Sequence, residues 1–310
     1  MILSVTPNTG LDRVLFLPEL RRNRRNQAEA VEAMGGKGCD VSLILREWGI
    51  ETVATGLAAG ETGRKMEAML RRAGVVADFV WTEGETRTNT VLIETASGAH
   101  TTVCAAGLRP DGQALPALLG WVERWAPSAE AVVLAGSLPE SWPSSVYADL
   151  VRAARGADRP VPVIVDASGP ALEAALAAGV DAIKPNRDEL ETVCGPAPGP
   201  GALLAAARAL RERGAGRVLV SLGPEGALLV CGNGAWRAEG LRVPVVNPAG
   251  AGDGMTACLA LGAARGWNEA ETLRWAVAVS AAIVTTRGTA EIRRADAERL
   301  LPEVRVERVS

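Results

Sequence analysis

The sequence predicts an α/β fold in which helices cover a mainly parallel β-sheet. Short apolar runs such as residues 131–138 (AVVLAGSL) and 162–168 (PVIVDAS) lack the alternation of a half-exposed strand, so they are expected to be buried on both faces. Helical patterns such as residues 147–156 (YADLVRAARG) separate these runs. This alternation is typical of successive β-α-β units.

The remaining elements follow in chain order. A strand is predicted at residues 1–7, and a helix follows at 41–49, where Val41, Leu45 and Trp48 have helical spacing. Residues 252–286 are Ala-rich and apolar enough to be largely internal helix. The full set comprises strands at 1–7, 131–138, 162–168, 182–186, 217–223 and 227–230, and helices at 41–49, 147–156, 169–179, 201–214, 252–266 and 273–286, with 195–201 as a surface loop.

Two segments interrupt the alternation. Residues 11–34 and 77–104 resemble hairpin strands, with a turn at Ser97-Gly98 in the second. Because they bracket a helix of the main body, we expect them to form one small β-sheet inserted as a lid. The chain is therefore predicted to be a single domain spanning residues 1–310.

Composition narrows the function classes. The formal net charge is −3, so no global positive field favours nucleic acid or an anionic membrane, and the short basic run 21–25 is interpreted as a solvated loop. The five cysteines form no C-x-x-C pair and no apolar segment is long enough for a membrane span, which suggests a cytoplasmic protein. With His100 as the only histidine, a catalytic base is expected to be a carboxylate.

The strongest motif is NPAGAGDGMTACLALG at residues 247–262. Gly250, Ala251 and Gly252 allow a tight turn that presents backbone N–H groups at a helix start, where a phosphate or a developing oxyanion could bind. Asp253 lies at that helix start and could accept the proton of an attacking hydroxyl group. The residues alone fit an ordinary capping Asp equally well.

With other segments, this motif resembles the PfkB family of ribokinase-like carbohydrate kinases. The segments MGGKGCD (34–40), GETRTN (84–89), GSLP (136–139), KPNRDEL (184–190) and SLGPEGALLV (221–230) follow in the family's order, and TPNTGLDR lies near the start. The resemblance covers nearly the whole chain and is strongest to the branch with 1-phosphofructokinase and tagatose-6-phosphate kinase. It implies a ribokinase-like three-layer α/β/α domain that uses ATP and Mg²⁺.

The resemblance also implies roles for individual residues. Asp253 would be the catalytic base, with Gly250, Ala251 and Gly252 forming the anion hole. Substrate binding would involve Asp12, Gly36, Lys37, Asp40, Arg87 and Ser137; the nucleotide would contact Lys184, Asn186, Ser221, Gly223, Gly226 and Ser280; and Mg²⁺ would be placed by Asn186 and Glu189.

Taken without the resemblance, several of these residues have simpler interpretations. Asp12 could cap a turn, Arg87 could be a solvated cross-strand charge, and Asn186 with Glu189 could be a capped helix start. The segment 221–230 alone is an ordinary hairpin, and Ser280 alone is a residue of a buried helix.

The substrate pocket departs from the family pattern. Asp40 replaces the usual Asn, which places a carboxylate in the sugar pocket and discourages a nearby phosphate. Gln27 stands where an Arg is common, and Ala105 stands where a Glu is expected. The catalytic motif is retained while the sugar pocket is altered.

We therefore expect ATP-dependent phosphorylation of a sugar phosphate hydroxyl group. One alternative is the same fold acting on an unphosphorylated sugar or a nucleoside, and another is a non-catalytic sugar-binding or regulatory protein. Exposed edges of the lid sheet make a homodimer plausible. No nucleic-acid or membrane partner is expected.

Overall fold

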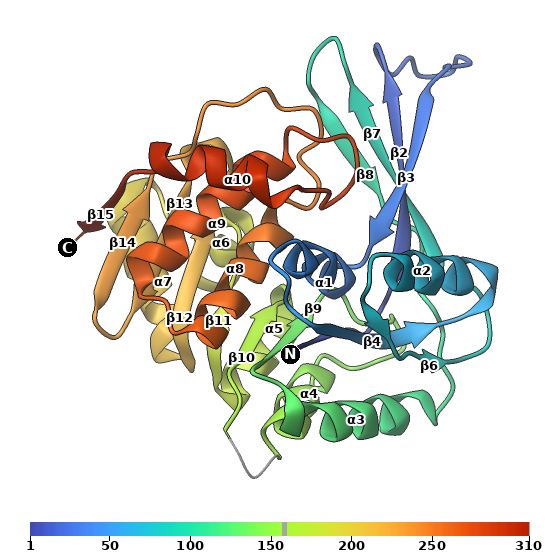
Figure 1. Ribbon diagram of the computed structural model, residues 1–310, viewed down its shortest axis with the longest axis horizontal. Coiled ribbons are helices and arrows are strands. Elements are labelled where there is room, and N and C mark those ends of the chain that lie inside the picture. Colours follow the sequence, from blue (N-terminus) through green and yellow to red (C-terminus); the bar gives the residue numbers. More distant parts are fainter. Residues whose placement is uncertain (157–159, 310) are drawn as a thin grey trace.

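A mainly parallel β-sheet forms the centre of the molecule (Figure 1), for which a computed structural model describes residues 1–156 and 160–309. The strand order is β15-β14-β13-β12-β11-β10-β9-β1-β4-β5, and β6 also pairs with β4. The strands are β1 (Ile2–Thr6), β4 (Thr52–Ala58), β5 (Val76–Ala77), β6 (Val80–Trp81), β9 (Ala131–Ala135), β10 (Val163–Asp166), β11 (Val180–Ile183), β12 (Ala215–Ser221), β13 (Ala227–Cys231), β14 (Gly234–Ala238) and β15 (Val306–Val309).

The pairing from β5 and β6 through β12 is parallel, and β13, β14 and β15 extend the sheet as an antiparallel edge. The central strands β1 and β9 are buried along their whole length, which explains their continuous apolar sequences. Because these strands are parallel, the loops that follow them gather at the carboxyl ends of the strands. Ligand sites of open α/β sheets lie at these ends.

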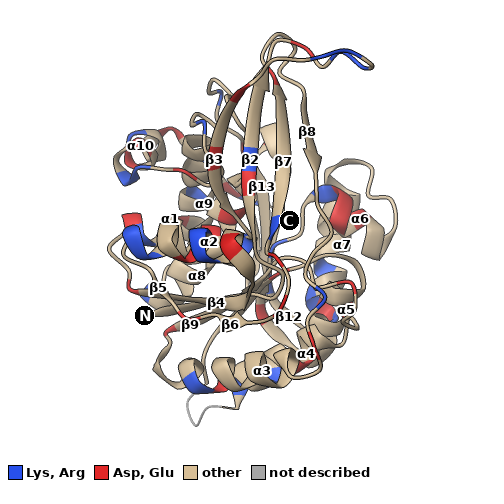
Figure 2. Ribbon diagram, turned by 90° about the vertical axis from the view of Figure 1, so that its right-hand side faces the viewer, with Lys and Arg blue, Asp and Glu red and all other residues tan. Residues whose placement is uncertain are grey.

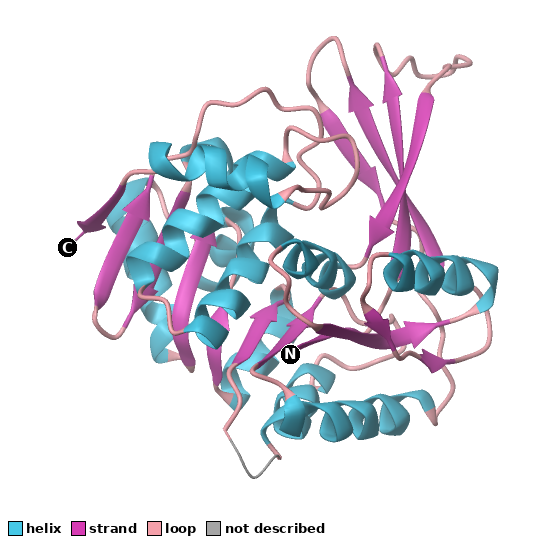
Figure 3. Cartoon of the chain, in the orientation of Figure 1, coloured by secondary structure: helices cyan, strands magenta, loops and turns pink. Residues whose placement is uncertain are grey.

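Helices cover both faces of this sheet (Figure 3). One face carries α3 (Ala114–Trp125), α4 (Val146–Arg155), α5 (Gly169–Ala178), α6 (Arg187–Cys194) and α7 (Gly199–Glu212), and the other carries α1 (Lys37–Glu47), α8 (Ala251–Arg265), α9 (Glu269–Ile283) and α10 (Arg294–Leu300). Each layer has its own apolar core, with Leu118 and Leu150 in the first and Leu259 and Val277 in the second. The predicted three-layer α/β/α architecture is confirmed.

A second, four-stranded sheet projects from the main body, at the upper right in Figure 1. Its order is β3-β2-β7-β8, comprising β2 (Gly10–Leu17), β3 (Glu29–Gly35), β7 (Arg87–Glu94) and β8 (His100–Val103), and α2 (Gly60–Arg72) packs against β2. Val14, Phe16, Val91 and Ile93 form a small apolar core on one face of this sheet. Alternating burial along β7 explains the alternating sequence there.

The structure differs from the sequence expectation at several elements, among them the segments 77–86 and 195–201. Residues 77–86 were placed in the small sheet, whereas β5 and β6 pair with β4 of the main sheet, and only β7 and β8 of that segment belong to the small sheet. The loop expected at 195–201 is shorter because α7 begins at Gly199, with Pro200 in the first turn, where its missing N–H costs nothing.

The basic run at 21–25 lies in the exposed loop that joins β2 and β3 (Figure 2), as expected. In the parts of the chain that the structure describes, no helix combines the length and the apolarity required to cross a membrane.

Candidate active site

Residues from distant parts of the chain meet in a cavity of about 470 Å³ beyond the C-terminal ends of β9 and β10, next to the small sheet. Nine of the residues predicted from sequence line it: Asp12, Gly36, Lys37, Asp40, Arg87, Ser137, Glu189, Gly250 and Asp253. Most of the lining residues are polar or charged, which suits a polyhydroxylated or phosphorylated ligand.

The turn before α8 brings the chain close to a neighbouring loop. Gly250 has φ = 85°, and a Cβ atom at this position would lie 2.2 Å from the backbone nitrogen of Ala290, so only glycine fits. α8 begins at Ala251, and the N–H of Gly252 has no intrahelical acceptor because it lies in the first turn. The helix therefore begins with N–H groups that can bind an anion.

Asp253 is the third residue of α8 and is 8% exposed. Burial, together with the negative charge of Asp166, raises the pKa of Asp253 to about 7, although Lys37 and Lys184 act in the opposite direction. A carboxyl group with this pKa can accept a proton near neutral pH, which is the property required of a general base.

A buried ion cluster lies beside Asp253. Asp166, at the end of β10, pairs with Lys37 at 2.7 Å and with Lys184 at 3.4 Å, and it accepts a hydrogen bond from the Thr256 hydroxyl at 2.9 Å. Burial alone would raise the pKa of Asp166, but the two ammonium groups outweigh it and lower the pKa. The cluster fixes both cations next to the start of α8.

Sequence reasoning missed Asp166. The available signal was its position directly after the buried run VIV, at the carboxyl end of a parallel strand. The ammonium group of Lys37, which the resemblance assigns to substrate binding, donates a hydrogen bond to Asp166. Lys184 is 4% exposed and points into the same cluster.

The first turn of α1 forms another wall of the cavity. Gly36, with φ = 96°, precedes the helix and allows it to begin at Lys37, earlier than the sequence pattern predicted. Asp40 is 2% exposed, and its Oδ1 has no hydrogen-bond partner among the described residues.

Asp12 faces the cavity from β2. Its Oδ1 accepts a hydrogen bond from the Asn89 amide at 3.0 Å, and its Oδ2 accepts one from the Thr289 hydroxyl at 3.2 Å. A Cβ atom at Gly35 would lie 2.6 Å from Asp12 Oδ1, which explains why glycine occurs there. Burial raises the pKa of Asp12, and its hydrogen bonds only partly offset this effect.

Arg87 reaches across from β7. Its guanidinium donates hydrogen bonds to the Asn8 carbonyl at 3.2 Å and to the Ser137 hydroxyl at 3.1 Å, while its buried Nε has no partner among the described side chains and backbone. Asn8 lies in a segment that carries the family resemblance, but no role was predicted for it. The arrangement leaves guanidinium donors at the cavity wall for an anionic ligand.

Asn186 and Glu189 form a reciprocal cap at the start of α6. Asn186 Oδ1 accepts from the Glu189 N–H at 2.8 Å, and Glu189 Oε2 accepts from the Asn186 N–H at 2.8 Å. The predicted capped helix start is confirmed, and Glu189 also lines the cavity. Ser221 lies next to Asn186, in a bridge between the ends of β11 and β12.

The remaining predicted residues lie outside the lining of this cavity. Gly223 and Gly226 belong to the tight connection between β12 and β13, and a Cβ atom at Gly226 would lie 2.1 Å from the Ala238 carbonyl oxygen. Ser280 is half-buried on α9, and its backbone nitrogen would lie 3.7 Å from a Cβ atom at Gly254 of α8. Among the departures, Gln27 is in the exposed loop of the small sheet, and Ala105 donates its N–H to Asn89 Oδ1 at 3.3 Å.

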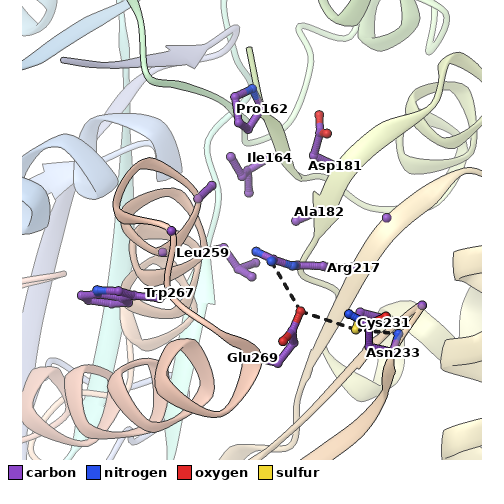
Figure 4. A pocket seen from close by; sticks show the side chains of 15 residues that line it. Pro162, Ile164, Asp181, Ala182, Arg217, Cys231, Asn233, Leu259, Trp267 and Glu269 are labelled. Carbon is purple, nitrogen blue, oxygen red and sulfur yellow. Dashed lines mark hydrogen bonds and ion pairs between the residues drawn. The ribbon is translucent and has the colours of Figure 1, made fainter. Parts of the chain in front are cut away.

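A second cavity of similar volume, about 500 Å³, lies at the opposite, N-terminal ends of β10, β11 and β12 (Figure 4). Its charged groups include Arg217, which pairs with Glu269 at 3.4 Å. None of the residues predicted from sequence lines it. The helix N-terminus, the paired lysines and the carboxyl groups with raised pKa values all occur at the first cavity, so its chemistry identifies it as the candidate active site.

Comparisons with known proteins identify relatives that are carbohydrate kinases. The model of the pfkB family carbohydrate kinases matches residues 10–295. The chain is 35% identical to a 1-phosphofructokinase of Xanthomonas campestris, covering 97% of this chain and 94% of that protein, and 32% identical to a 1-phosphofructokinase of Escherichia coli K12, covering 92% and 91%. The solved structure of Escherichia coli phosphofructokinase-2 with fructose-6-phosphate superimposes with a TM-score of 0.85 at 28% identity, covering 97% and 98%.

Proposed function

This chain belongs to the PfkB family of carbohydrate kinases and is an ATP-dependent sugar phosphate kinase, and we propose that its acceptor is a ketohexose monophosphate of the fructose 1-phosphate or tagatose 6-phosphate type. The proposal depends on one observation. The same cavity contains a buried carboxyl group at a helix start, Asp253, and the guanidinium group of Arg87, whose Nε has no hydrogen-bond partner among the described residues. The first can take a proton from a hydroxyl group, and the second can hold a phosphate.

In the proposed reaction, a hydroxyl oxygen of the acceptor attacks the γ-phosphorus of ATP. A new oxygen–phosphorus bond forms, the bond to the β,γ-bridging oxygen breaks, and ADP leaves. Asp253 receives the hydroxyl proton, and the N–H groups of Ala251 and Gly252 stabilise the charge on the transferred phosphoryl group. Asp166 holds Lys37 and Lys184 beside the same helix start, where their charges favour the polyphosphate.

Mg²⁺ fits this site only as an ion shared with the nucleotide. No group of three or more acidic, Cys or His side chains suited to a metal occurs among residues 1–156 and 160–309. Glu189 uses Oε2 in the helix cap, and its other carboxylate oxygen is available at the cavity. Glu189 and Asn186 would hold a hydrated Mg²⁺, which would neutralise phosphate charge when bound.

Glu189→Gln should raise the Mg²⁺ concentration that gives half-maximal activity. Gln can still close the reciprocal cap with Asn186, so the change removes charge while keeping the local fold. Initial rates measured against Mg²⁺ at saturating ATP check this expectation. An unchanged Mg²⁺ dependence would remove Glu189 from the metal site.

The rate should depend on the ionisation of Asp253. Only the ionised form accepts a proton, so with a pKa of about 7 the value of kcat/KM should fall as the pH is lowered through neutrality, approaching tenfold per pH unit. A pH profile of kcat/KM measured in wild type checks this. If kcat/KM instead fell only near pH ~4, where an ordinary carboxyl group is protonated, the result would contradict this expectation.

Arg87→Ala should weaken binding of a phosphorylated acceptor by about 1.5–3 kcal/mol, the contribution of a hydrogen bond to a charged group, and should have little effect on a neutral sugar. KM values for both acceptor types test the difference. Arg13→Ala is a matched control, because Arg13 is an exposed arginine of the same small sheet. Equal effects on both acceptor types would argue against phosphate binding by Arg87.

A second candidate is an unphosphorylated sugar or a nucleoside. The observation that favours it is the acidic character of the cavity, where Asp12, Asp40 and Asp253 lie together. Ionised carboxylates close to a phosphate dianion would oppose its binding. The protonation state of these groups therefore bears on the choice of acceptor.

The small sheet would act as the lid of this site, because Asp12, Asn89 and Arg87 reach the cavity from its strands. Closure over the bound substrates would exclude water and protect ATP from hydrolysis. Its outer strands, β3 and β8, leave edges that a second copy of the chain could pair with, and β8 is exposed along its length. A homodimer through the lid remains part of the proposal.

A further inference from the structure

Asp40 is a buried carboxyl group for which the described part of the chain supplies no hydrogen-bond donor at Oδ1. Its side chain is 2% exposed and lines the active-site cavity, and its Oδ1 is enclosed without a hydrogen bond from any described residue. Buried carboxylates normally accept several hydrogen bonds or pair with a cation, because leaving water as a bare anion is costly. The surroundings of Asp40 therefore decide its charge.

Two other carboxyl groups line the same cavity, Asp253 from α8 and Asp12 from β2. Their negative charges raise the pKa of Asp40 further. Strands β1, β4 and β9, which pack against α1, contain no charged residue, and the two glutamates of β3, Glu29 and Glu32, form ion pairs outside the cavity. Three carboxyl groups at one site without a dedicated cation do not all ionise together.

Among the described residues, no Lys or Arg forms an ion pair with Asp40. Lys37 and Lys184 both pair with Asp166, and Arg87 donates to a backbone carbonyl and a hydroxyl group on the opposite wall. Asp40 does lie in the first turn of α1, where the helix dipole favours a negative charge. That effect is weaker than complete burial beside two like charges.

We propose that Asp40, which the family resemblance already places in the sugar pocket, is a neutral carboxylic acid in the working enzyme and therefore donates as well as accepts hydrogen bonds there. Burial, reinforced by Asp253 and Asp12, holds the pKa of Asp40 well above its usual range. The protonated group offers one donor and a free acceptor oxygen, much as the amide of an Asn does. The substitution at this position thus preserves the hydrogen-bonding pattern of an amide.

This inference rests on the proposed function and sharpens it. The sequence alone suggested that Asp40 would repel a phosphate in the sugar pocket. A neutral Asp40 contributes no such repulsion, so the cavity can take an acceptor that is both polyhydroxylated and anionic, with Arg87 positioned for the anionic group.

The first test compares the pH profile of kcat/KM in wild type and Asp40→Asn. If Asp40 is already neutral, the amide leaves the charge beside Asp253 unchanged, and the acidic limb should stay within ~0.3 pH units of wild type. If Asp40 is ionised, its removal relieves Asp253 of a like charge. The limb would then move down by ~1 pH unit or more, and this result would overturn the proposal.

A second pair of variants tests specificity. Asp40→Leu has neither donor nor acceptor and should raise KM for the acceptor at least ~10-fold above that of Asp40→Asn, with KM for ATP unaffected, because a sugar hydroxyl loses its partner. Equal acceptor KM values in the two variants would remove Asp40 from acceptor recognition.

A spectroscopic test needs no turnover. At about pH 8.5, above the pKa of about 7 of Asp253, infrared spectra of protein labelled with ¹³C-aspartate should show a carbonyl band of a protonated carboxyl group in wild type that is missing in Asp40→Asn. Its absence would overturn the proposal. Because this readout is independent of the acceptor, failure to phosphorylate a sugar phosphate would be distinguishable from an ionised Asp40.

Discussion

Asp253→Asn should lower kcat by about 10²–10⁴-fold, the range expected when a general base is removed. The amide has nearly the shape of the carboxyl group and cannot accept the hydroxyl proton. Since Asp253 lies in the first turn of α8 and is not the N-cap residue, which is Gly250, the fold should tolerate the change. Steady-state rates, together with ATP affinity by calorimetry, measure the effect.

Asp296→Asn provides the matched control for this variant. Asp296 is also an acidic residue in the first turn of a helix, α10, and its partner is the exposed Arg293. The turnover rate of the Asp296→Asn variant should equal that of wild type. Turnover of Asp253→Asn close to the control rate would exclude Asp253 as the base, whereas a loss of ATP binding would indicate a structural effect.

Asp166→Asn should lower the free energy of unfolding by about 3–5 kcal/mol, because it leaves the buried Lys184 and the neighbouring Lys37 without their counter-charge. Removing one partner of a buried ion pair destabilises a protein far more than removing one partner of an exposed ion pair. The midpoint of urea unfolding should fall accordingly, with the m-value used to check that the transition is comparable.

Glu173→Gln is the control for the Asp166 variant, since Glu173 pairs with Arg213 at the surface, where both side chains are more than 40% exposed. The Glu173→Gln change should alter the free energy of unfolding by no more than about 1 kcal/mol. Equal shifts in the two variants would show that the Asp166 cluster does not stabilise the fold.

Patterns that depend on neighbouring residues were predictable from the sequence. Continuous apolar runs gave the buried strands β1, β9 and β10, and the Gly-rich turn before Asp253 indicated the start of α8. The pairing of Asn186 with Glu189 followed from their spacing of three residues. These features are set by local backbone geometry and by burial.

Contacts between distant segments were less accessible. The cluster of Asp166 with Lys37 and Lys184 joins a strand end, a helix start and a loop. No local sequence pattern predicts ion pairs between such distant segments. The sequence prediction placed β5 and β6 in the small sheet instead of the main sheet, because two-residue strands carry too little periodicity to indicate their partner. The charge of Asp40 likewise depends on neighbours that only the fold brings together.

The most direct test is a comparison of acceptors with the purified wild-type protein, ATP and Mg²⁺, followed as ADP formation and identified by the phosphorylated product. We expect fructose 1-phosphate or tagatose 6-phosphate to have the highest kcat/KM and to yield one bisphosphate for each ADP released. A preference for free fructose, ribose or a nucleoside over both sugar phosphates would contradict the account of the acceptor, even if Asp253 proved to be the base.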